Sequence, residues 1–154
     1  MLGFFGWLTL ALVVMEVVAY VTHRFLFHGV LWFIHESHHR HTHGPFELND
    51  VFSLGFAAIS MVLMYLGRGA WLADPRFAIG LGIAIYGILY FIIHDLFTHK
   101  RFWPFKSTNN AMHTVRRAHQ RHHQSAERPG QEPYGLFLFP YDRYNTPFQR
   151  KRKP

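Results

Sequence analysis

Three long stretches of the chain are almost free of charged side chains. Residues 2–22 contain one acidic residue, Glu16, and no basic residue, and residues 51–67 and 77–93 are uncharged. A helix that crosses the hydrocarbon core of a bilayer needs about 20 mostly apolar residues, with about 17 at the short end of the range. The pattern therefore predicts membrane-spanning helices near residues 3–22, 51–67 and 77–93.

The polar segments predict further helices beyond the spans. The first helix is expected to extend out of the membrane as far as Gly29, which can end it, and the third to continue to about Lys100. A short helix is expected over residues 30–42, and another, opened by an asparagine cap, over about residues 110–125. Residues 126–154 are rich in proline and aromatic side chains, so we expect an irregular segment that packs onto the functional site or the lipid surface.

Together these elements predict an all-α integral membrane protein with a histidine-rich helical cap, folded as one domain over residues 1–154. About three spans are expected, and four are the alternative. A cleavable signal peptide would also explain the first apolar stretch, but no basic region precedes it and no small-residue cleavage site follows it. We interpret the glycines inside the spans as general tolerance of glycine in lipid, rather than as close helix packing.

Charged residues make up 16% of the chain, which is low for a soluble domain, and their distribution predicts an orientation. Arg68 and Arg76 flank the loop between the second and third spans, and the other fourteen of the sixteen Lys and Arg residues lie on the opposite side. The positive-inside rule makes that side cytoplasmic. We therefore expect a protein of the cell inner membrane, with its N-terminus outward and its histidine clusters and C-terminus in the cytoplasm.

The net charge of +7 follows from the same rule, so no nucleic-acid partner is expected. The basic run at residues 150–153 is expected to contact anionic membrane lipid. The chain contains no cysteine, which excludes disulfides, thiolate catalysis, iron–sulfur clusters and cysteine-bound zinc within it. Any metal ion must therefore be held by nitrogen or oxygen ligands.

Ten of the thirteen histidines form two matched sets, each with an H-x-x-x-x-H pair followed by an H-x-x-H-H triplet. Imidazole suits iron, copper, nickel and zinc, and a first-row metal ion takes no more than about six ligands. The sequence therefore predicts a two-metal site, with no catalytic residue beyond the ligands. The predicted ligands are His23, His28, His35, His38 and His39 from the first set, and His94, His99, His119, His122 and His123 from the second.

Helix geometry separates the two kinds of motif. Residues three and four apart share a helix face, so each H-x-x-H-H triplet is expected to hold a metal ion from a single helix. Residues five apart lie about 140° from each other on a regular helix. The H-x-x-x-x-H pairs therefore require a π-bulge or a frayed helix end, or their two rings serve different metal ions or opposite sides of the cluster.

Four polar residues are candidates to fix the ring orientation of the ligands from outside, namely Glu47, Asn49, Asp50 and Asp95. Helix capping or interfacial polarity is an equally weighted alternative for them. A separate group of three histidines lies outside the repeated pattern, and we expect interfacial or hydrogen-bonding roles for its members. This group consists of His41, His43 and His113.

The donor set favours iron and dioxygen. Zinc hydrolases usually combine three protein ligands with nearby carboxylates, whereas the nine Asp and Glu residues here are mostly remote from the histidine clusters. A nitrogen-rich dimetal site at a bilayer surface suits oxidation of an apolar substrate that arrives from the membrane. A membrane metal-binding or transport protein is the non-enzymatic alternative. Transporters, however, place ionisable groups at midplane between spans, and Glu16 is the single such residue here.

The combined pattern resembles the membrane fatty acid hydroxylase and desaturase superfamily of non-haem di-iron enzymes, and most closely its β-carotene 3-hydroxylase branch. That branch shows the four histidine motifs in the order found here. The likeness extends over roughly residues 15–140, and the chain departs from the pattern at His41 and His43 and in the segment after Gly130. The segments that carry it are HRFLFHG at 23–29, Leu31-Trp32, HESHH at 35–39, FELND at 46–50, YFIIHD at 90–95 and AHQRHH at 118–123.

The resemblance implies hydroxylation at C3 of the β-ionone rings, which converts β-carotene through β-cryptoxanthin to zeaxanthin. It implies two non-haem iron ions held by the ten histidines, O2 as co-substrate, and ferredoxin with its NAD(P)H-dependent reductase as the electron donor. The alternatives are a hydroxylase or desaturase that acts on a fatty acyl or sterol lipid, and a carotenoid ketolase.

Overall fold

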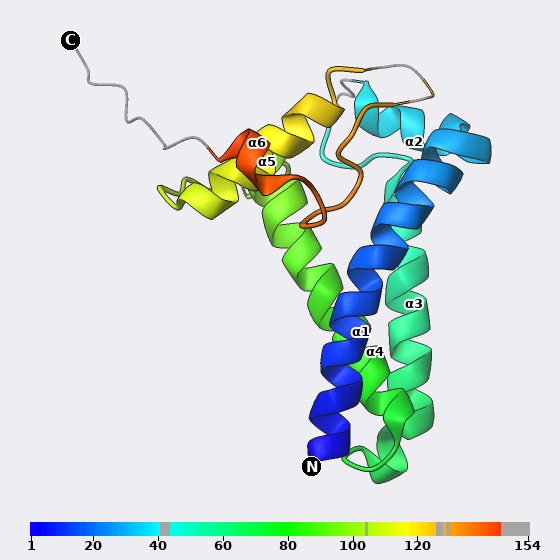
Figure 1. The fold of residues 1–154 in the computed structure, drawn as a ribbon. Helices are drawn as coiled ribbons and strands as arrows, with labels where there is room; N and C mark the ends of the chain where they lie inside the picture. The colour runs from blue at the N-terminus through cyan, green and yellow to red at the C-terminus, as the bar shows by residue number, and fades with distance from the viewer. Residues whose placement is uncertain (41–43, 104, 126–127, 129, 146–154) are drawn as a thin grey trace.

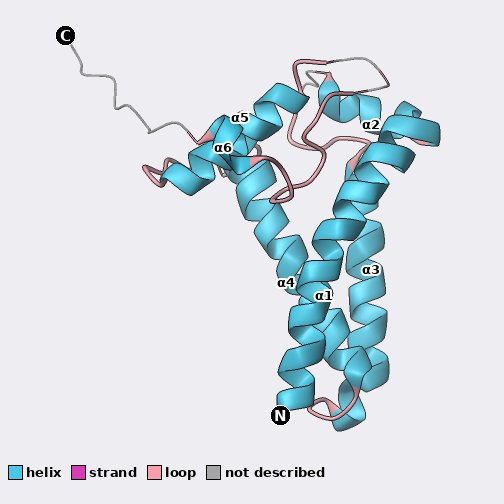
Figure 2. Cartoon of the chain, in the orientation of Figure 1, coloured by secondary structure: helices cyan, strands magenta, loops and turns pink. Residues whose placement is uncertain are grey.

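The computed structural model describes residues 1–40, 44–103, 105–125, 128 and 130–145, and these residues form helices and irregular segments without a β-strand (Figure 2). Three long helices form a stalk: α1 (Leu2–Val21), α3 (Asp50–Gly67) and α4 (Pro75–Tyr90). With their helical extensions, all three are long and apolar enough to cross a membrane, and the described residues contain no fourth helix of this kind. The predicted all-helical membrane fold with three spans is therefore confirmed.

Shorter helices extend the stalk and build a cap. The π-helix η1 (Thr22–Val30) continues α1, the 3₁₀-helix η2 (Arg68–Ala70) follows α3, and the π-helix η3 (Phe91–Thr98) continues α4. The cap contains α2 (Trp32–His39), α5 (Asn110–His122) and the short α6 (Tyr141–Tyr144), and it lies at the end of the stalk opposite to the N-terminus (Figure 1). Helix α6 was not expected, because we predicted an irregular segment there.

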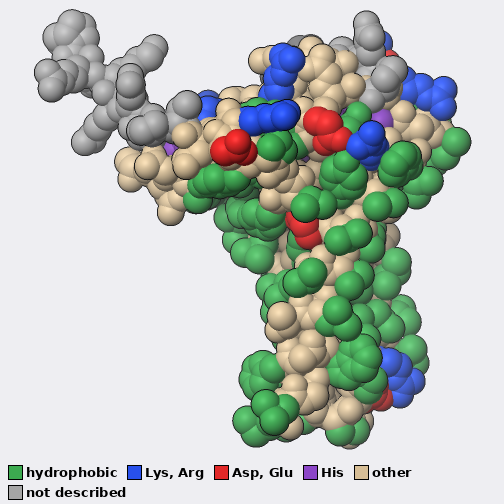
Figure 3. Space-filling model, in the orientation of Figure 1, with side chains coloured by type: hydrophobic (Ala, Val, Ile, Leu, Met, Phe, Trp, Pro, Cys, Tyr) green, Lys and Arg blue, Asp and Glu red, His purple; other side chains and the backbone are tan. Residues whose placement is uncertain are grey.

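The stalk and its two ends differ in side-chain chemistry. Hydrophobic side chains cover the visible face of the stalk, and Lys and Arg residues gather at its two ends (Figure 3). Many apolar side chains of the stalk are exposed, for example Val13 at 61%, Met61 at 61% and Ile88 at 58%. A soluble protein rarely exposes so large an apolar surface, whereas a membrane covers it. The stalk is therefore the membrane-embedded part of the molecule.

Two glycines of α4 let the stalk helices lie close together. Helix α4 packs against both α1 and α3. A Cβ atom on Gly80 would lie 2.8 Å from the carbonyl oxygen of Ser60, and one on Gly82 would lie 2.7 Å from α1. Such contacts leave no room for a side chain, so our interpretation of these two glycines as mere tolerance is wrong. Among the described residues, no atom lies within 4 Å of the same position on Gly55 or Gly87.

Candidate metal centre

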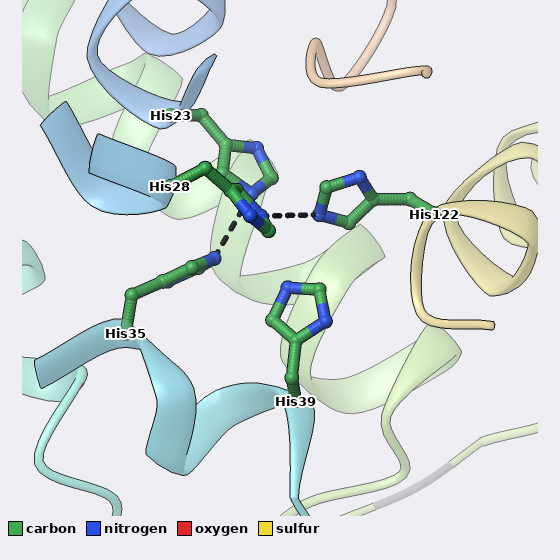
Figure 4. Close-up of side chains that lie close together, drawn as sticks. All are labelled: His23, His28, His35, His39 and His122. Atoms are coloured by element: carbon green, nitrogen blue, oxygen red, sulfur yellow. Dashed lines mark hydrogen bonds between the residues drawn. The ribbon is translucent and has the colours of Figure 1, made fainter. Parts of the chain in front are cut away.

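The ten patterned histidines converge in the cap, although η1, α2, α5 and the end of η3 supply them. In two groups, one ligand atom from each residue lies within 4.8 Å of the others, so each group could hold a metal ion. The first centre consists of His23, His28, His35, His39 and His122, whose rings point toward one another in Figure 4. The second centre consists of His38, His99, His119 and His123. His94 adjoins the second centre, with its Nε2 3.2 Å from the Nε2 of His38.

Two π-helical segments bring the histidines of the H-x-x-x-x-H pairs together. At the end of η3 the His99 N–H donates to the carbonyl of His94 at 2.9 Å, five residues back. This winding places residues i and i+5 on one side of the helix. The ring centroids of His23 and His28 lie 5.1 Å apart, and those of His94 and His99 lie 4.6 Å apart. The local distortion that the spacing required is confirmed.

Each H-x-x-H-H triplet is divided between the two centres, so the prediction that one triplet holds one metal ion is wrong. His35 and His39 belong to the first centre, whereas His38 belongs to the second. Consecutive residues differ by about 100° around a helix, so His38 and His39 diverge although each lies near the direction of His35. The second triplet divides in the same way, with His122 in the first centre and its two partners in the second. Helices α2 and α5 therefore each contribute to both centres.

Backbone carbonyls orient four histidines of the first centre. A carbonyl oxygen only accepts, so the Nδ1 atom beside it carries the proton and the Nε2 lone pair turns toward the centre. The carbonyls come at every third residue of the segment that follows α5. The pairs are His39 with Ser125 (3.0 Å), His28 with Arg128 (3.0 Å), His122 with Gln131 (2.5 Å) and His23 with Tyr134 (2.7 Å). The expected packing of the C-terminal segment onto the site is confirmed for Arg128, Gln131 and Tyr134.

The donor atoms fit bound cations. His28 and His122 both donate from Nδ1 to carbonyls, so their unprotonated Nε2 atoms face each other at 3.0 Å. Two lone pairs at this separation repel each other, whereas two nitrogens bound about 2.1 Å from one ion at right angles lie about 3.0 Å apart. Among the described residues, the buried Nε2 atoms of His39 and His123 also have no hydrogen-bond partner. A metal ion in each centre would satisfy these atoms.

Burial keeps several of the cap histidines neutral, which is the form that binds metal. Loss of hydration lowers the pKa of His35 to about 3, the pKa of His39 to about 4 and the pKa of His99 to about 2. Burial, and then the neighbouring histidines, also lower the pKa of His38 and His119. These rings are therefore neutral at neutral pH, with one nitrogen free to bind a metal ion.

Two of the predicted polar residues orient a histidine directly. Glu47 Oε2 accepts a hydrogen bond from His38 Nδ1 at 2.8 Å, and Asn49 Oδ1 accepts one from His35 Nδ1 at 2.7 Å. Asn49 also stands at the start of α3, but its side chain makes no capping hydrogen bond. Of the two roles left open for Asn49, the structure therefore supports ring orientation.

Arg101 gathers the acidic residues beside the second centre, and we did not single it out from the sequence. Its guanidinium donates to Asp95 at 2.6 Å and to Asp50 at 2.7 Å, and it lies 3.9 Å from Glu47. Asp95 lies 3.6 Å from Nδ1 of His94, whereas Asp50 also accepts from the Glu47 N–H. The three acidic candidates named from the sequence thus lie together on the outer side of the second centre. The available signal was a basic residue two positions after a predicted ligand.

The fatty acid hydroxylase family model matches residues 8–146. The chain belongs to the fatty acid hydroxylase family. It is 40% identical over 129 residues to a β-carotene hydroxylase of Pantoea ananas, covering 82% of this chain and 71% of that protein. It is 42% identical over 142 residues to a chloroplastic β-carotene 3-hydroxylase of an Oncidium hybrid cultivar, covering 90% of this chain and 46% of that protein. No solved structure gives a significant match.

The resemblance drawn from the histidine motifs is confirmed by these matches, and the family membership indicates an oxygen-dependent hydroxylase. Within this family member, His113 lies outside both centres, as expected from its position. Its Nε2 contacts the carbonyl of Ser107 at 2.6 Å, and its ring packs against Phe97. His41 and His43 lie outside the described residues.

Proposed function

We propose that the chain hydroxylates the β-ionone rings of β-carotene at C3, giving β-cryptoxanthin and then zeaxanthin, with O2 as co-substrate and electrons from an external donor. The observation that carries this proposal is the pair of histidine centres at the end of three apolar helices. The proposal is also supported by the relatives described above, which are named β-carotene hydroxylases.

We propose two non-haem iron ions, held by the ten histidines of the two centres, with His94 completing the second. When bound, the two ions supply the activation of O2 that attack on an unactivated C–H bond requires. The contribution of the chain itself is to present neutral rings with their Nε2 lone pairs already aimed. Glu47, Asn49 and the backbone carbonyls fix these tautomers through Nδ1.

Aromatic side chains lie where the spans meet the centres, and they suit an apolar substrate that arrives from the bilayer. Phe27 stacks on Phe52 with ring centroids 3.8 Å apart, and the ring centroids of Phe27 and His23 lie 6.3 Å apart. The ring of Tyr90, at the end of α4, lies 4.4 Å from the ring of His94. These rings can hold a hydrocarbon ring beside the metal-binding nitrogens and exclude water from them.

A polar cavity reaches the second centre separately. It has a volume of about 580 Å³ and is lined by His99 together with Arg40, Lys100 and Arg101, among others. Its charged lining is unsuited to a carotenoid, so we assign the supply of O2 and electrons to this side. For the donor we propose ferredoxin with its NAD(P)H-dependent reductase, because basic residues attract an acidic protein. Electron-transfer rates that do not change with ionic strength would argue against such steering.

We place the protein in the inner membrane of the cell, with the cap in the cytoplasm and the N-terminus outward. Support comes from the positive-inside rule, because Arg68 and Arg76 are the two basic residues at the other end of the spans. The plant relatives are named as chloroplastic. Reporter fusions at each terminus, read separately for cytoplasmic and external activity, test this orientation.

Coexpression in bacteria that accumulate β-carotene tests the function. The unmodified chain is expected to convert β-carotene to hydroxylated products, the variant His38→Ala to lose this conversion, and the matched control His113→Ala to retain it. Persistence of β-carotene beside folded, iron-loaded protein overturns the proposal. Because the family is named for fatty acid hydroxylation, mass spectrometry of the lipids from the same cells reveals a hydroxylated acyl chain if that is the true product.

A further inference from the structure

Glu16 is the one ionisable carboxylate in the first span, and the proposed chemistry does not use it. Its Oε2 accepts a hydrogen bond from the Tyr86 hydroxyl at 2.7 Å. Its Oε1 accepts hydrogen bonds from the backbone N–H groups of Phe137 at 2.8 Å and Leu138 at 2.7 Å. A carboxylate within a span is costly and needs partners of this kind. Glu16 therefore joins α1 and α4 to the segment that connects α5 and α6.

Residues 130–139, here called the strap, run from the cap into the apolar zone and form the orange segment that descends from the cap in Figure 1. At its upper end Glu132 forms an ion pair with Arg24 at 2.6 Å. At its lower end it meets Glu16, which precedes Arg24 by eight residues on the same helical segment and so lies about 12 Å deeper. The lower part of the strap, Gly-Leu-Phe-Leu-Phe at 135–139, is apolar.

Irregular backbone at membrane depth needs internal partners, because lipid offers no acceptor for an N–H group. Phe137 and Leu138 are 45% and 50% exposed, so their side chains face the surroundings of the stalk while their N–H groups turn inward to Glu16. The carboxylate thus supplies the acceptor that the strap requires at this depth.

The upper part of the same strap orients the first metal centre. The carbonyl of Gln131 accepts from His122 Nδ1, and the carbonyl of Tyr134 accepts from His23 Nδ1. Tyr134 is 8% exposed, and its ring packs 5.5 Å from the ring of His23. The position of the strap therefore decides whether these two rings present Nε2 to the centre.

Two glycines allow the strap to approach both partners. Gly130 has φ +61°, and a Cβ there would lie 2.7 Å from Nδ1 of His28. A Cβ on Gly135 would lie 2.7 Å from Oε1 of Glu16. Neither position accepts a side chain without displacing the strap. A substitution at Gly135 therefore disturbs the contact between the strap and Glu16 without changing a span.

We propose that Glu16 is a positioning residue for the first metal centre: by clamping the strap, it holds the carbonyls of Gln131 and Tyr134 against His122 and His23. This inference rests on the metal-binding role proposed above for the two centres. The second centre does not depend on the strap, because Glu47 and the Arg101 cluster support it. Loss of the clamp should therefore affect one metal ion and spare the other.

Metal content of the purified full-length protein, loaded with iron(II) and dialysed against a graded series of chelators, tests this. For Glu16→Leu the affinity of one site is expected to fall about 10–100-fold, so about one ion per chain remains where the unmodified protein keeps about two. Gly135→Ala should give the same result. Glu16→Gln retains an acceptor for the two N–H groups and should keep both ions. Ser60→Ala, which removes a hydrogen bond of 2.7 Å to Gly80 elsewhere in the stalk, should also keep both.

A labelling experiment tests the clamp without using metal or activity. The chain has no cysteine, so Leu138→Cys introduces a single thiol. In proteoliposomes a thiol at the clamped position faces lipid, stays protonated and reacts slowly with a membrane-impermeant maleimide. Adding Glu16→Leu is expected to raise the labelling rate about tenfold, because the unsatisfied backbone then leaves the hydrocarbon.

Retention of both ions by Glu16→Leu and Gly135→Ala, or an unchanged labelling rate, overturns the proposal and leaves the hydroxylase function standing. Loss of both ions together in these variants also overturns it, because the effect would not be confined to the first centre. If the unmodified protein binds no metal, the proposed function fails instead, and the labelling rate still decides whether Glu16 clamps the strap.

Discussion

The hydrogen bond between His38 and Glu47 allows a quantitative test of the second centre. The two atoms are 2.8 Å apart, and the His38 residue is 5% exposed. Removal of an outer partner from a metal-binding histidine costs about 10–100-fold in metal affinity, or about 1.4–2.7 kcal/mol. His38 and Glu47 both line the polar cavity, so water can partly replace the lost acceptor, and Glu47→Ala should fall within this range. Glu47→Gln keeps an oxygen acceptor and should cost about tenfold or less.

The effect should be confined to one site, because the partners of the two centres are separate. Asn49→Ala is the matched variant, since Asn49 holds His35 in the first centre at a similar distance, 2.7 Å. The fold around Glu47 should persist in Glu47→Ala, because Arg101 keeps its ion pairs with Asp50 and Asp95.

Competition between the protein and chelators of graded affinity resolves two apparent dissociation constants. Glu47→Ala should raise the dissociation constant of the second centre and leave that of the first centre unchanged. Asn49→Ala should raise the dissociation constant of the first centre only, and the double variant should show both increases. Equal weakening of both sites by either variant, or no weakening by Glu47→Ala, would refute the division of the histidines into two separately supported centres.

Two further predictions concern stability. Gly80→Ala should destabilise the protein in detergent by about 1–3 kcal/mol, because its Cβ would lie 2.8 Å from Ser60 O, whereas Gly87→Ala, with nothing within 4 Å, should change the unfolding midpoint little. Metal-free protein should lose stability as the pH falls below about 6.5, because unfolded histidines then bind protons while burial holds the pKa of His35 at about 3 and that of His39 at about 4. Denaturation at pH 7.5 and pH 5.5 measures the difference, and equal stability at both pH values would contradict this reasoning.

The sequence by itself predicted the stalk and the histidines that the structure brings together. The spans follow from the absence of charge over residues 51–67 and 77–93, because transfer into lipid is a local property of each stretch. The need for either a local distortion or divided roles between His94 and His99 follows in the same way, since angular spacing along a regular helix depends on residue number alone. The candidates Glu47 and Asn49 were also visible, because a polar residue near a histidine motif is itself a sequence feature.

Only the tertiary structure decided how these parts are allocated. His38 and His39 are neighbours in the chain, yet they belong to different centres, because the ring of His39 meets His28 of η1 whereas the ring of His38 meets His94 of η3. The carbonyls of the strap leave no trace in the sequence, because every residue has one. The partners of Glu16 are backbone N–H groups up to 122 positions away, and a contact of that range is fixed by folding rather than by any local pattern.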